Sequence, residues 1–298
     1  MSIDGILNVN KPEGKTSFSI VALLRWLSGE KHVGHAGTLD PIATGVLPIC
    51  IGQATRVVQF LADSNKTYLA QIELGIATDT FDREGKITHR KDPSNISVTQ
   101  IEKALKNFKG SIQQSPPIYS AVKRQGRRLY ELARSGIQVK IKPRQVKITS
   151  NEIISYELPI LTIKVECSKG TYIRSLAHDL GQYLGCGAHI SNLTRIQCGP
   201  FLIEDSLPLS EIECIFKQGI LDRSLHPVDT PLLSWNAVIV DETNELAIKN
   251  GCSIPLDEEN PTKIKHCRAY SSDGRFLAIL HYASNSNLWH PDKVFSIG

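Results

Sequence analysis

The sequence predicts an α+β fold in which a large, mainly antiparallel mixed sheet is flanked by helices and followed by a small β-rich C-terminal module. Segments that alternate like strands are interspersed with segments of helical periodicity. Near LHPVDTPLLSW (225–235), two prolines coincide with a reversal in the sign of the charge. The chain of 298 residues is long enough for two domains. We therefore expect one domain over 1–228 and a second over 232–298.

The first elements follow from local signals. GILNVNKP (5–12) has the pattern of a strand that runs into a turn. Ser17 is placed to cap a helix that continues through Trp26, and Gly29 is placed to end it. Three later segments rich in β-branched and aromatic residues predict strands, at 67–74, 145–155 and 161–167.

Helical periodicity returns at 98–108 and is clearest at 172–184. In the second of these segments one apolar stripe is formed by Ile173, Leu176, Ala177, Leu180 and Leu184. Beyond the charge reversal, the short segments AVIV, CRAY, RFLAILHY and KVFSI predict the strands of the C-terminal module. A module this short is marginal alone, so we expect it to pack on the main domain.

The composition limits the classes of protein. A hydrophobic content of 41% with 21% charged residues is typical of a soluble globular protein. The first residues show no signal peptide, and no apolar run is long enough to span a bilayer, so we expect a cytoplasmic location and no membrane partner. The seven cysteines are scattered and form no CxxC pair, which favours reduced thiols over a disulfide scaffold or a structural zinc site.

The positive charge is unevenly distributed. Residues 1–228 hold 28 Lys/Arg against 21 Asp/Glu, whereas residues 229–298 hold 6 against 9. The densest cluster, at 123–147, has nine basic residues and one acid, with Tyr119 and Tyr130 nearby. Such a run is either a solvated face or a surface for phosphates, and its clustering with tyrosines favours a nucleic-acid partner.

The segment GHAGTLDPIATGVLPI (34–49) holds a single carboxylate, Asp40, among apolar residues. Pro41 disfavours helical geometry at Asp40, and the glycines permit close backbone approach or positive φ angles. The segment therefore predicts a rigid loop that presents one carboxylate. Spacing alone leaves open whether that carboxylate bonds to its own turn or acts in catalysis.

The segment HAGTLDPIATGVLPI resembles the catalytic-aspartate motif of the TruB-type tRNA pseudouridine(55) synthases, and it matches the motif at every fixed position. NKPEGKTSF (10–18) resembles the family's Lys-Pro motif. Collinear matches follow in KTYLAQIELGIATDTFDREG (66–85), SPPIYSAVKRQGRRLYELAR (115–134) and CSKGTYIRSLAHDLGQYLG (167–185). The resemblance covers residues 5–200 and implies the pseudouridine synthase fold, with a T-arm-binding insertion at about 110–150. More loosely, the tail resembles the family's RNA-binding module of PUA type.

The resemblance implies a chemistry that explains the residue types. A pseudouridine synthase cleaves the bond between N1 and C1′ of a uridine, turns the base and rejoins it through C5, so no metal, nucleotide or flavin is required. The resemblance assigns the catalytic carboxylate to Asp40 and its ion-pair partner to Arg174, which would lower the pKa of Asp40 and orient it. It assigns to Tyr68 the ring that stacks on the base, with its hydroxyl near C5.

Further residues are carried over from the same motifs. Tyr172 and Leu193 resemble the walls that hold the uracil, and Lys11 with Pro12 resembles the motif that supports the catalytic loop. The resemblance implies that His35 fills the space left by the target nucleotide.

Two more polar groups are assigned in the same way. Asp82 resembles a polar contact to a flipped-out nucleotide, although an ordinary Asp-rich turn explains it equally well. Arg127 and Arg128 belong to the basic cluster and are candidate contacts to the phosphates of the T stem.

Two other classes of function are open at this point. A non-catalytic tRNA-binding or tRNA-folding protein could use the same surface, but it would have no need of the set Asp40, Tyr68 and Arg174. A glycosidase would need a second placed carboxylic acid, and the matching motifs supply none. Within the family we expect the stand-alone bacterial type, a monomer that binds the T stem-loop of tRNA without a guide RNA.

Overall fold

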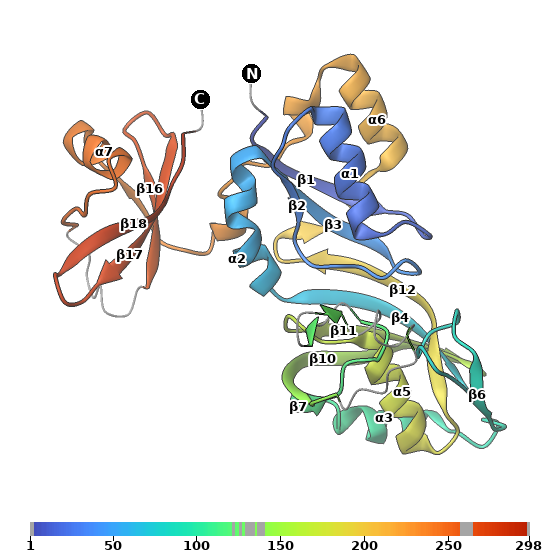
Figure 1. Ribbon diagram of the computed structural model, residues 1–298. Helices are drawn as coiled ribbons and strands as arrows, with labels where there is room; N and C mark the ends of the chain where they lie inside the picture. Colours follow the sequence, from blue (N-terminus) through green and yellow to red (C-terminus); the bar gives the residue numbers. More distant parts are fainter. Residues whose placement is uncertain are drawn as a thin grey trace.

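The computed structural model describes residues 3–120, 141–256 and 265–296, the turn residue Ser135, and the backbone of two short paired strands, β8 (Lys123–Arg124) and β9 (Arg127–Arg128). Figure 1 shows a large body that carries both flanking helices and a long sheet, with a smaller β-rich unit beside it. The α+β class predicted from the sequence is confirmed.

A ten-stranded sheet forms the centre of the body, with the order β14-β1-β3-β12-β4-β11-β10-β7. Its main strands are β1 (Gly5–Lys11), β3 (Thr44–Ile51), β4 (Lys66–Leu74), β7 (Gly110–Gln114), β10 (Arg144–Glu157), β11 (Ile160–Cys167) and β12 (Ala188–Cys198). The short strands β2 (Val33–His35) and β13 (Phe201–Leu202) pair with β3 and β12, and β14 (Leu207–Pro208) lies at the edge. The pairs β1–β14 and β3–β12 are parallel and the others are antiparallel, so the sheet is mixed but mainly antiparallel.

Helices cover this sheet in two pairs. α1 (Ser17–Ser28) lies beside α6 (Leu209–Gln218), and α3 (Val98–Lys106) lies beside α5 (Ile173–Leu184), as Figure 1 shows. The apolar stripe predicted for α5 is buried against the sheet, and Gly185 ends the helix in the left-handed conformation. α5 follows β11 and leads into β12, two strands that lie on either side of β4 in the sheet.

Shorter elements complete the body. They are the 3-10 segments η1 (Gly52–Val57), η2 (Leu221–Ser224) and η3 (Thr230–Leu232), the helix α2 (Val58–Asp63), and the hairpin of β5 (Ile76–Thr78) and β6 (Ile87–Arg90). β7 and β10 pair with each other inside the main sheet. The two ends of the segment expected as an insertion, about 110–150, are therefore strands of the main sheet.

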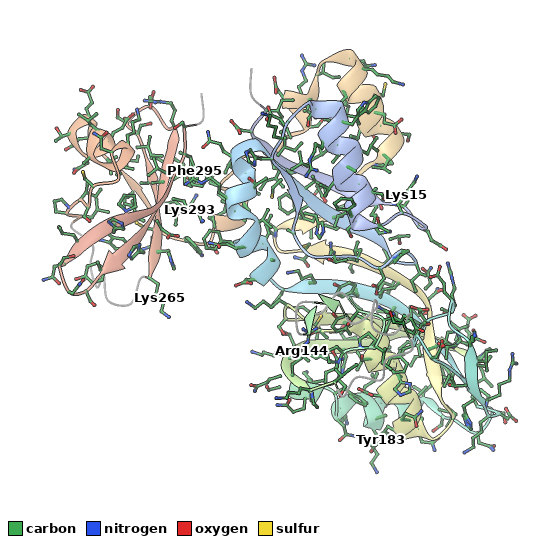
Figure 2. All side chains as sticks on the ribbon, in the orientation of Figure 1. Lys15, Arg144, Tyr183, Lys265, Lys293 and Phe295 are labelled. Carbon is green, nitrogen blue, oxygen red and sulfur yellow. The ribbon has the colours of Figure 1, made fainter. Side chains whose placement is uncertain are left out.

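The C-terminal module has its own four-stranded sheet, with the order β15-β16-β17-β18. The strands are β15 (Ala237–Ile239), β16 (His266–Tyr270), β17 (Phe276–Ala283) and β18 (Leu288–Val294), and one helix, α7 (Glu242–Lys249), joins them. Figure 2 shows Phe295 at the end of this module that faces α2. There the guanidinium of Arg56 lies 5.0 Å from the Phe295 ring, and Gln53 Nε2 donates to the carbonyl of Ser296 at 2.7 Å. The module is thus packed on the body, as its small size requires.

Several element predictions need correction. Thr16, not Ser17, caps α1 by accepting a hydrogen bond from the backbone N–H of Ser19 at 3.0 Å, because Ser17 is buried and its hydroxyl is used elsewhere. The last strand of the module ends at Val294, so the prediction of a strand over KVFSI was placed too late. The strands β3 and β12 were not predicted as separate elements, although both lie in the middle of the sheet.

Candidate active site

The loop that carries Asp40 is held from both sides. It lies between β2 and β3, and its turn is closed by the Ala43 N–H, which donates to the Asp40 carbonyl at 3.0 Å. The Ser17 hydroxyl accepts from the Leu39 N–H at 2.8 Å and lies 3.1 Å from the Leu39 carbonyl. Gly45 has φ 98°, and a Cβ there would lie 2.3 Å from the carbonyl oxygen of Arg195. Only glycine therefore fits at the base of this loop.

The Asp40 carboxylate meets a guanidinium from α5. Its Oδ2 lies 2.9 Å from Arg174 Nε, and the same guanidinium reaches Asp82 Oδ2 at 3.1 Å and the carbonyls of Thr80 and Tyr119 at 3.1 and 3.0 Å. Arg174 is 4% exposed, so this planar group is locked between two carboxylates. The ion pair expected between Asp40 and Arg174 is present in the structure.

Several charges act on the protonation of Asp40 in opposite directions. Burial raises the pKa of this carboxyl above its usual value of 3.8, and the neighbouring Asp82 carboxylate raises it further. Arg174 and Lys11 lower the pKa, as positive charges nearby must. The lowering expected from Arg174 is therefore present, but burial outweighs it.

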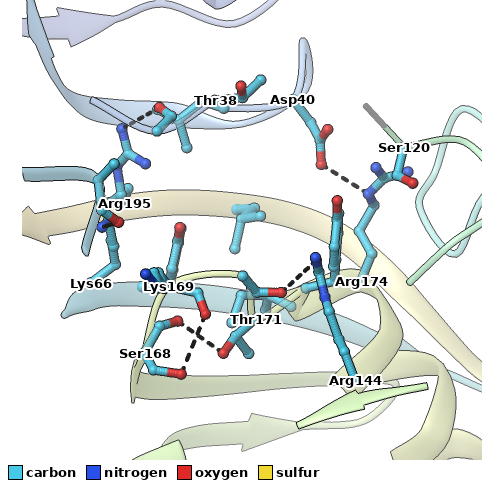
Figure 3. Close-up of a pocket in the computed structure, with 18 residues that line it drawn as sticks. Thr38, Asp40, Lys66, Ser120, Arg144, Ser168, Lys169, Thr171, Arg174 and Arg195 are labelled. Carbon is cyan, nitrogen blue, oxygen red and sulfur yellow. Dashed lines mark hydrogen bonds and ion pairs between the residues drawn. The ribbon is translucent and has the colours of Figure 1, made fainter. Parts of the chain in front are cut away.

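A cavity of about 350 Å³ opens at this carboxylate (Figure 3). Cavities of roughly 300–1,000 Å³ are typical of small-molecule sites. Asp40 is 34% exposed at its side chain and is the one carboxylate among the described residues that line the cavity. The lining also holds five basic side chains: Lys66, Arg144, Lys169, Arg174 and Arg195. Among the described residues, the lining therefore holds more basic than acidic side chains, with Asp40 as its carboxylate.

Three predicted residues form walls of the cavity. Tyr68 from β4 and Leu193 from β12 are buried, with 9% and 5% of each exposed. Burial raises the pKa of the Tyr68 phenol to about 12. Tyr172 is the cap residue of α5, and its ring lies 4.8 Å from the guanidinium of Arg144. The cavity thus has two aromatic rings and an aliphatic side chain around the carboxylate.

The Lys11 side chain holds the loop that carries Asp40 in place. Its ammonium is fully buried and donates to three carbonyls: Lys15 at 2.7 Å, Pro12 at 2.8 Å and Pro41 at 3.3 Å. Because Pro41 follows Asp40 directly, this contact fixes the backbone at the carboxylate. Burial lowers the pKa of Lys11 to about 8.

Replacing Lys11 with methionine is expected to destabilise the fold. The substitution leaves buried carbonyls without a donor, which costs about 1–3 kcal/mol. Thermal denaturation of Lys11→Met measures this, with the exposed Lys15→Met as the matched control. The pKa of Lys11 is about 8 in the folded chain against an ordinary 10.5, so the unfolded chain binds more protons between these values. Lys11 should therefore add stability as the pH rises through that window, and equal melting temperatures for both variants at every pH would contradict its role.

His35 and Asp82 are not among the described residues that line the cavity. The Nδ1 atom of His35 is buried with no hydrogen-bond partner, and the ring lies at the end of β2. Asp82 is 5% exposed, and its Oδ1 accepts from the Thr80 hydroxyl at 2.6 Å and from the Glu84 N–H at 3.1 Å. Asp82 therefore forms an ion pair with Arg174 and is not among the described residues that line the cavity. For Arg127 and Arg128 only the backbone pairing of β8 and β9 is described, and their side chains lie outside the described residues.

Sequence reasoning did not single out four of the basic residues that line the cavity: Lys66, Arg144, Lys169 and Arg195. Lys66 donates to the carbonyls of Leu61, Ala62 and Ser64 at 3.0, 2.6 and 2.6 Å and so caps α2. Arg195 is 1% exposed in β12, and Arg144 begins β10. Alternation in AHISNLTRIQC (188–198) would have placed Leu193 and Arg195 on one face, but that strand was not predicted.

Solved structures with the same fold define the class of protein. A chain of a Cbf5–Nop10–Gar1 complex superposes with a TM-score of 0.74 at 26% identity, and the match covers 98% of this chain and 85% of that one. A chain of an H/ACA RNP bound to a substrate RNA superposes with a TM-score of 0.73 at 23% identity, with the same coverage. The fold is thus that of the pseudouridine synthase class.

Comparison at the level of sequence gives the family. The model of the TruB family pseudouridylate synthase N-terminal domain matches residues 25–173, and that of the tRNA pseudouridylate synthase B C-terminal domain matches residues 174–233. A protein of Dehalococcoides mccartyi named tRNA pseudouridine synthase B is 45% identical over 98% of this chain and 97% of its own. Proteins of the same name from Clostridium kluyveri and Pseudomonas aeruginosa are 45% and 41% identical, each over 93% of this chain and over 95% and 91% of their own. The chain belongs to the TruB family of pseudouridylate synthases, which are isomerases.

Two further properties can be stated for the part of the chain that the structure describes. Its helices are all too short or too polar to cross a membrane. Its His, Cys, Asp and Glu side chains form no group of three or more that could hold a metal ion.

Proposed function

We propose that this enzyme converts uridine 55, in the T loop of tRNA, to pseudouridine. The observation that carries the proposal is the Asp40 carboxylate, which is paired with Arg174 at 2.9 Å in a cavity also lined by Tyr68, Tyr172 and Leu193. The cavity fits one flipped nucleotide with a phosphate beside basic side chains. The relatives named tRNA pseudouridine synthase B support tRNA as the substrate.

Asp40 acts at the sugar–base bond. With the base in the cavity, the carboxylate lies beside C1′ and C6, and the bond between C1′ and N1 breaks. The electron pair of that bond stays with N1. After the base has turned, the π electrons of its C5–C6 double bond form the bond between C5 and C1′, so that C5 still carries its hydrogen and a double bond joins C6 and N1. The C5–H bond then breaks and its electron pair forms the C5–C6 double bond. The electrons of the former C6–N1 double bond return to N1, which takes a proton, and Tyr68 is placed to accept the proton from C5.

Tyr172 and Leu193 hold the base while it turns. A stacked nucleotide shields C1′, so the target must leave the stack at a cost of a few kcal/mol. Stacking on an aromatic ring returns about 1–3 kcal/mol per base. His35 occupies the space that the nucleotide vacates. Its buried, unpartnered Nδ1 atom is available to an RNA group brought against the loop.

The backbone of the T stem lies along the basic cluster at 123–147 and the cavity rim. Arg127 and Arg128 are the candidate phosphate contacts in this cluster. The C-terminal module serves as a PUA-like RNA-binding unit, and the enzyme works as a cytoplasmic monomer without a guide RNA. Asp82 contacts the flipped nucleotide only through Arg174.

Charge reversal of Arg127 and Arg128 together is expected to weaken tRNA binding and to flatten its salt dependence. Each lost phosphate contact lowers the slope of log K against log salt by about 0.7–0.9. Filter binding of Arg127→Glu/Arg128→Glu at several salt concentrations measures the slope. Lys103→Glu/Lys106→Glu, on the outer helix α3, is the matched control. A slope equal to that of the wild type would remove these two residues from the interface.

A glycosidase is not favoured by this geometry. A second carboxylate, that of Asp82, is near Asp40, but it does not line the cavity and is bound by Arg174, Thr80 and Glu84. It cannot act as the acid that protonates a leaving group.

The proposal is tested on a minimal substrate. We expect the wild-type enzyme to form pseudouridine in an isolated T stem-loop RNA, detected by nucleoside analysis after digestion. The control is an anticodon stem-loop of equal length, assayed at the same salt concentration. Equal modification of both RNAs would refute the preference for the T loop, and modification of neither would refute the proposed substrate.

A further inference from the structure

Arg195 is a buried cation at the junction of three strands. In the register of β12 it lies opposite Gly45 of β3 on one side and Tyr68 of β4 on the other. Side chains directly opposite each other in neighbouring antiparallel strands share one face of the sheet. Arg195 and Tyr68 accordingly both line the cavity, and the charge of Arg195 acts to lower the pKa of the Tyr68 phenol.

The same guanidinium holds both sides of the catalytic loop. Arg195 Nε donates to the carbonyl of Val46 at 2.6 Å, and Nη2 donates to the carbonyl of Gly37 at 3.3 Å. These two carbonyls lie before and after Asp40 in the chain. Figure 3 shows Arg195 across the cavity from the pair of Asp40 and Arg174. One side chain thus joins the loop of Asp40 to the strand of Tyr68.

The charge of Arg195 has no carboxylate to balance it among the residues that the structure describes. Arg174, the other buried arginine of the cavity, is paired with two carboxylates. Arg195 is 1% exposed, its guanidinium donates to backbone carbonyls, and Tyr68 lies opposite it in the neighbouring strand. Burying an uncompensated charge is costly unless negative charge develops near it. The neighbouring group that can become negative during the proposed reaction is the Tyr68 oxygen.

We propose that Arg195 is a positioning residue for Tyr68, which it orients toward C5 of the turned base and whose phenolate it stabilises. The proposal deepens the function proposed above and rests on it. A phenolate is the form that accepts the C5 proton. The C5–H bond breaks and its electron pair forms the C5–C6 double bond, while the electrons of the C6–N1 double bond return to N1, which is protonated from water. Tyr68 later returns its proton to water. Burial alone disfavours that phenolate, and Arg195 counteracts burial.

The first test is kinetic and uses tRNA that carries deuterium at C5 of its uridines. We expect Arg195→Gln to slow a single turnover about 100-fold, with tRNA affinity nearly unchanged. The deuterium isotope effect should be larger than in the wild type, because the proton transfer from C5 has become limiting. Arg195→Lys, which keeps the charge, should recover part of the rate. Thr194→Val, a neighbouring change in the same strand, should behave as the wild type.

Two controls separate a positioning role from a structural one. In a Tyr68→Phe background, Arg195→Gln should cost little additional rate, because the two residues act as one unit. A slow Arg195→Gln enzyme with no increase in isotope effect, or with the same loss in the Tyr68→Phe background, would overturn the proposal. Melting temperatures identify any variant that is merely unfolded, and Arg195→Lys then replaces Arg195→Gln in the comparison.

The second test needs no turnover and is therefore independent of the proposed function. A ring-fluorinated tyrosine, which is more acidic than tyrosine, is placed at position 68 and titrated by fluorine NMR. We expect its pKa to be higher in Arg195→Gln than in the otherwise wild-type protein. An unchanged pKa would overturn the inference whatever the substrate is. If the pKa changes and no RNA is modified, only the proposed function fails.

Discussion

Asp40→Asn is expected to reduce the single-turnover rate of pseudouridine formation by at least about 10⁴-fold, the size of effect seen when a central catalytic group is removed. Asparagine keeps the shape and one oxygen but cannot carry the negative charge that the reaction needs beside C1′ and C6. tRNA affinity should stay close to that of the wild type, because phosphate contacts supply most of it. Rapid-quench kinetics and filter binding measure the two quantities.

The control for this variant is Asp92→Asn, in which an exposed carboxylate is changed in the same way. It should retain full activity. Appreciable product from a clean preparation of Asp40→Asn would remove Asp40 from the chemistry. Loss of both binding and activity would assign Asp40 to the structure of the loop instead.

Arg174→Met is expected to have the second-largest effect, a loss of about 10²- to 10³-fold in rate. The substitution leaves Asp40 and Asp82 without the cation that pairs with both, and breaking a buried pair costs about 3–5 kcal/mol. Arg174→Lys should recover little, because an ammonium cannot reproduce the planar fork that reaches both carboxylates. Arg83→Met, at a more exposed ion pair with Glu13, is the matched control.

The effect of Arg174→Met on the pH dependence of activity has a predicted direction. Asp40 must be ionised to act, so activity falls as the pH falls through its pKa in the folded enzyme. Burial raises that pKa, so the acid limb of the wild type should lie above 3.8. Arg174 lowers the pKa, so Arg174→Met should move the limb to higher pH. A limb that stays in place, or moves to lower pH, would contradict the ion pair as the source of the effect.

Sequence periodicity predicted some of the strands and helices of this chain and missed others. Periodicity was sufficient for β1, β4, β11 and α5, because each has a regular apolar pattern. It was insufficient for β12, in which Asn192, Thr194 and Gln197 interrupt the apolar positions and register shifts break the alternation. The cap of α1 was misplaced by one residue, since Thr16 and Ser17 are chemically equivalent and only packing selects between them.

The same distinction holds for the site. Asp40 and Lys11 lie in contiguous motifs, so their chemistry was visible locally. The meeting of Asp40 with Arg174 depends on strands distant in sequence, and only the resemblance predicted it. Arg195 was missed because its significance is its position opposite Tyr68, which no local pattern encodes. The structure pairs Asp82 with Arg174, a partner that its motif did not indicate.

The central claim is tested most directly by mapping pseudouridine at every uridine of a full tRNA transcript after incubation with the wild-type enzyme. We expect modification at uridine 55 with the wild-type enzyme, none with Asp40→Asn, and none in a transcript in which that uridine is replaced by cytidine. Modification at a different uridine, or equal modification by wild type and Asp40→Asn, would contradict it.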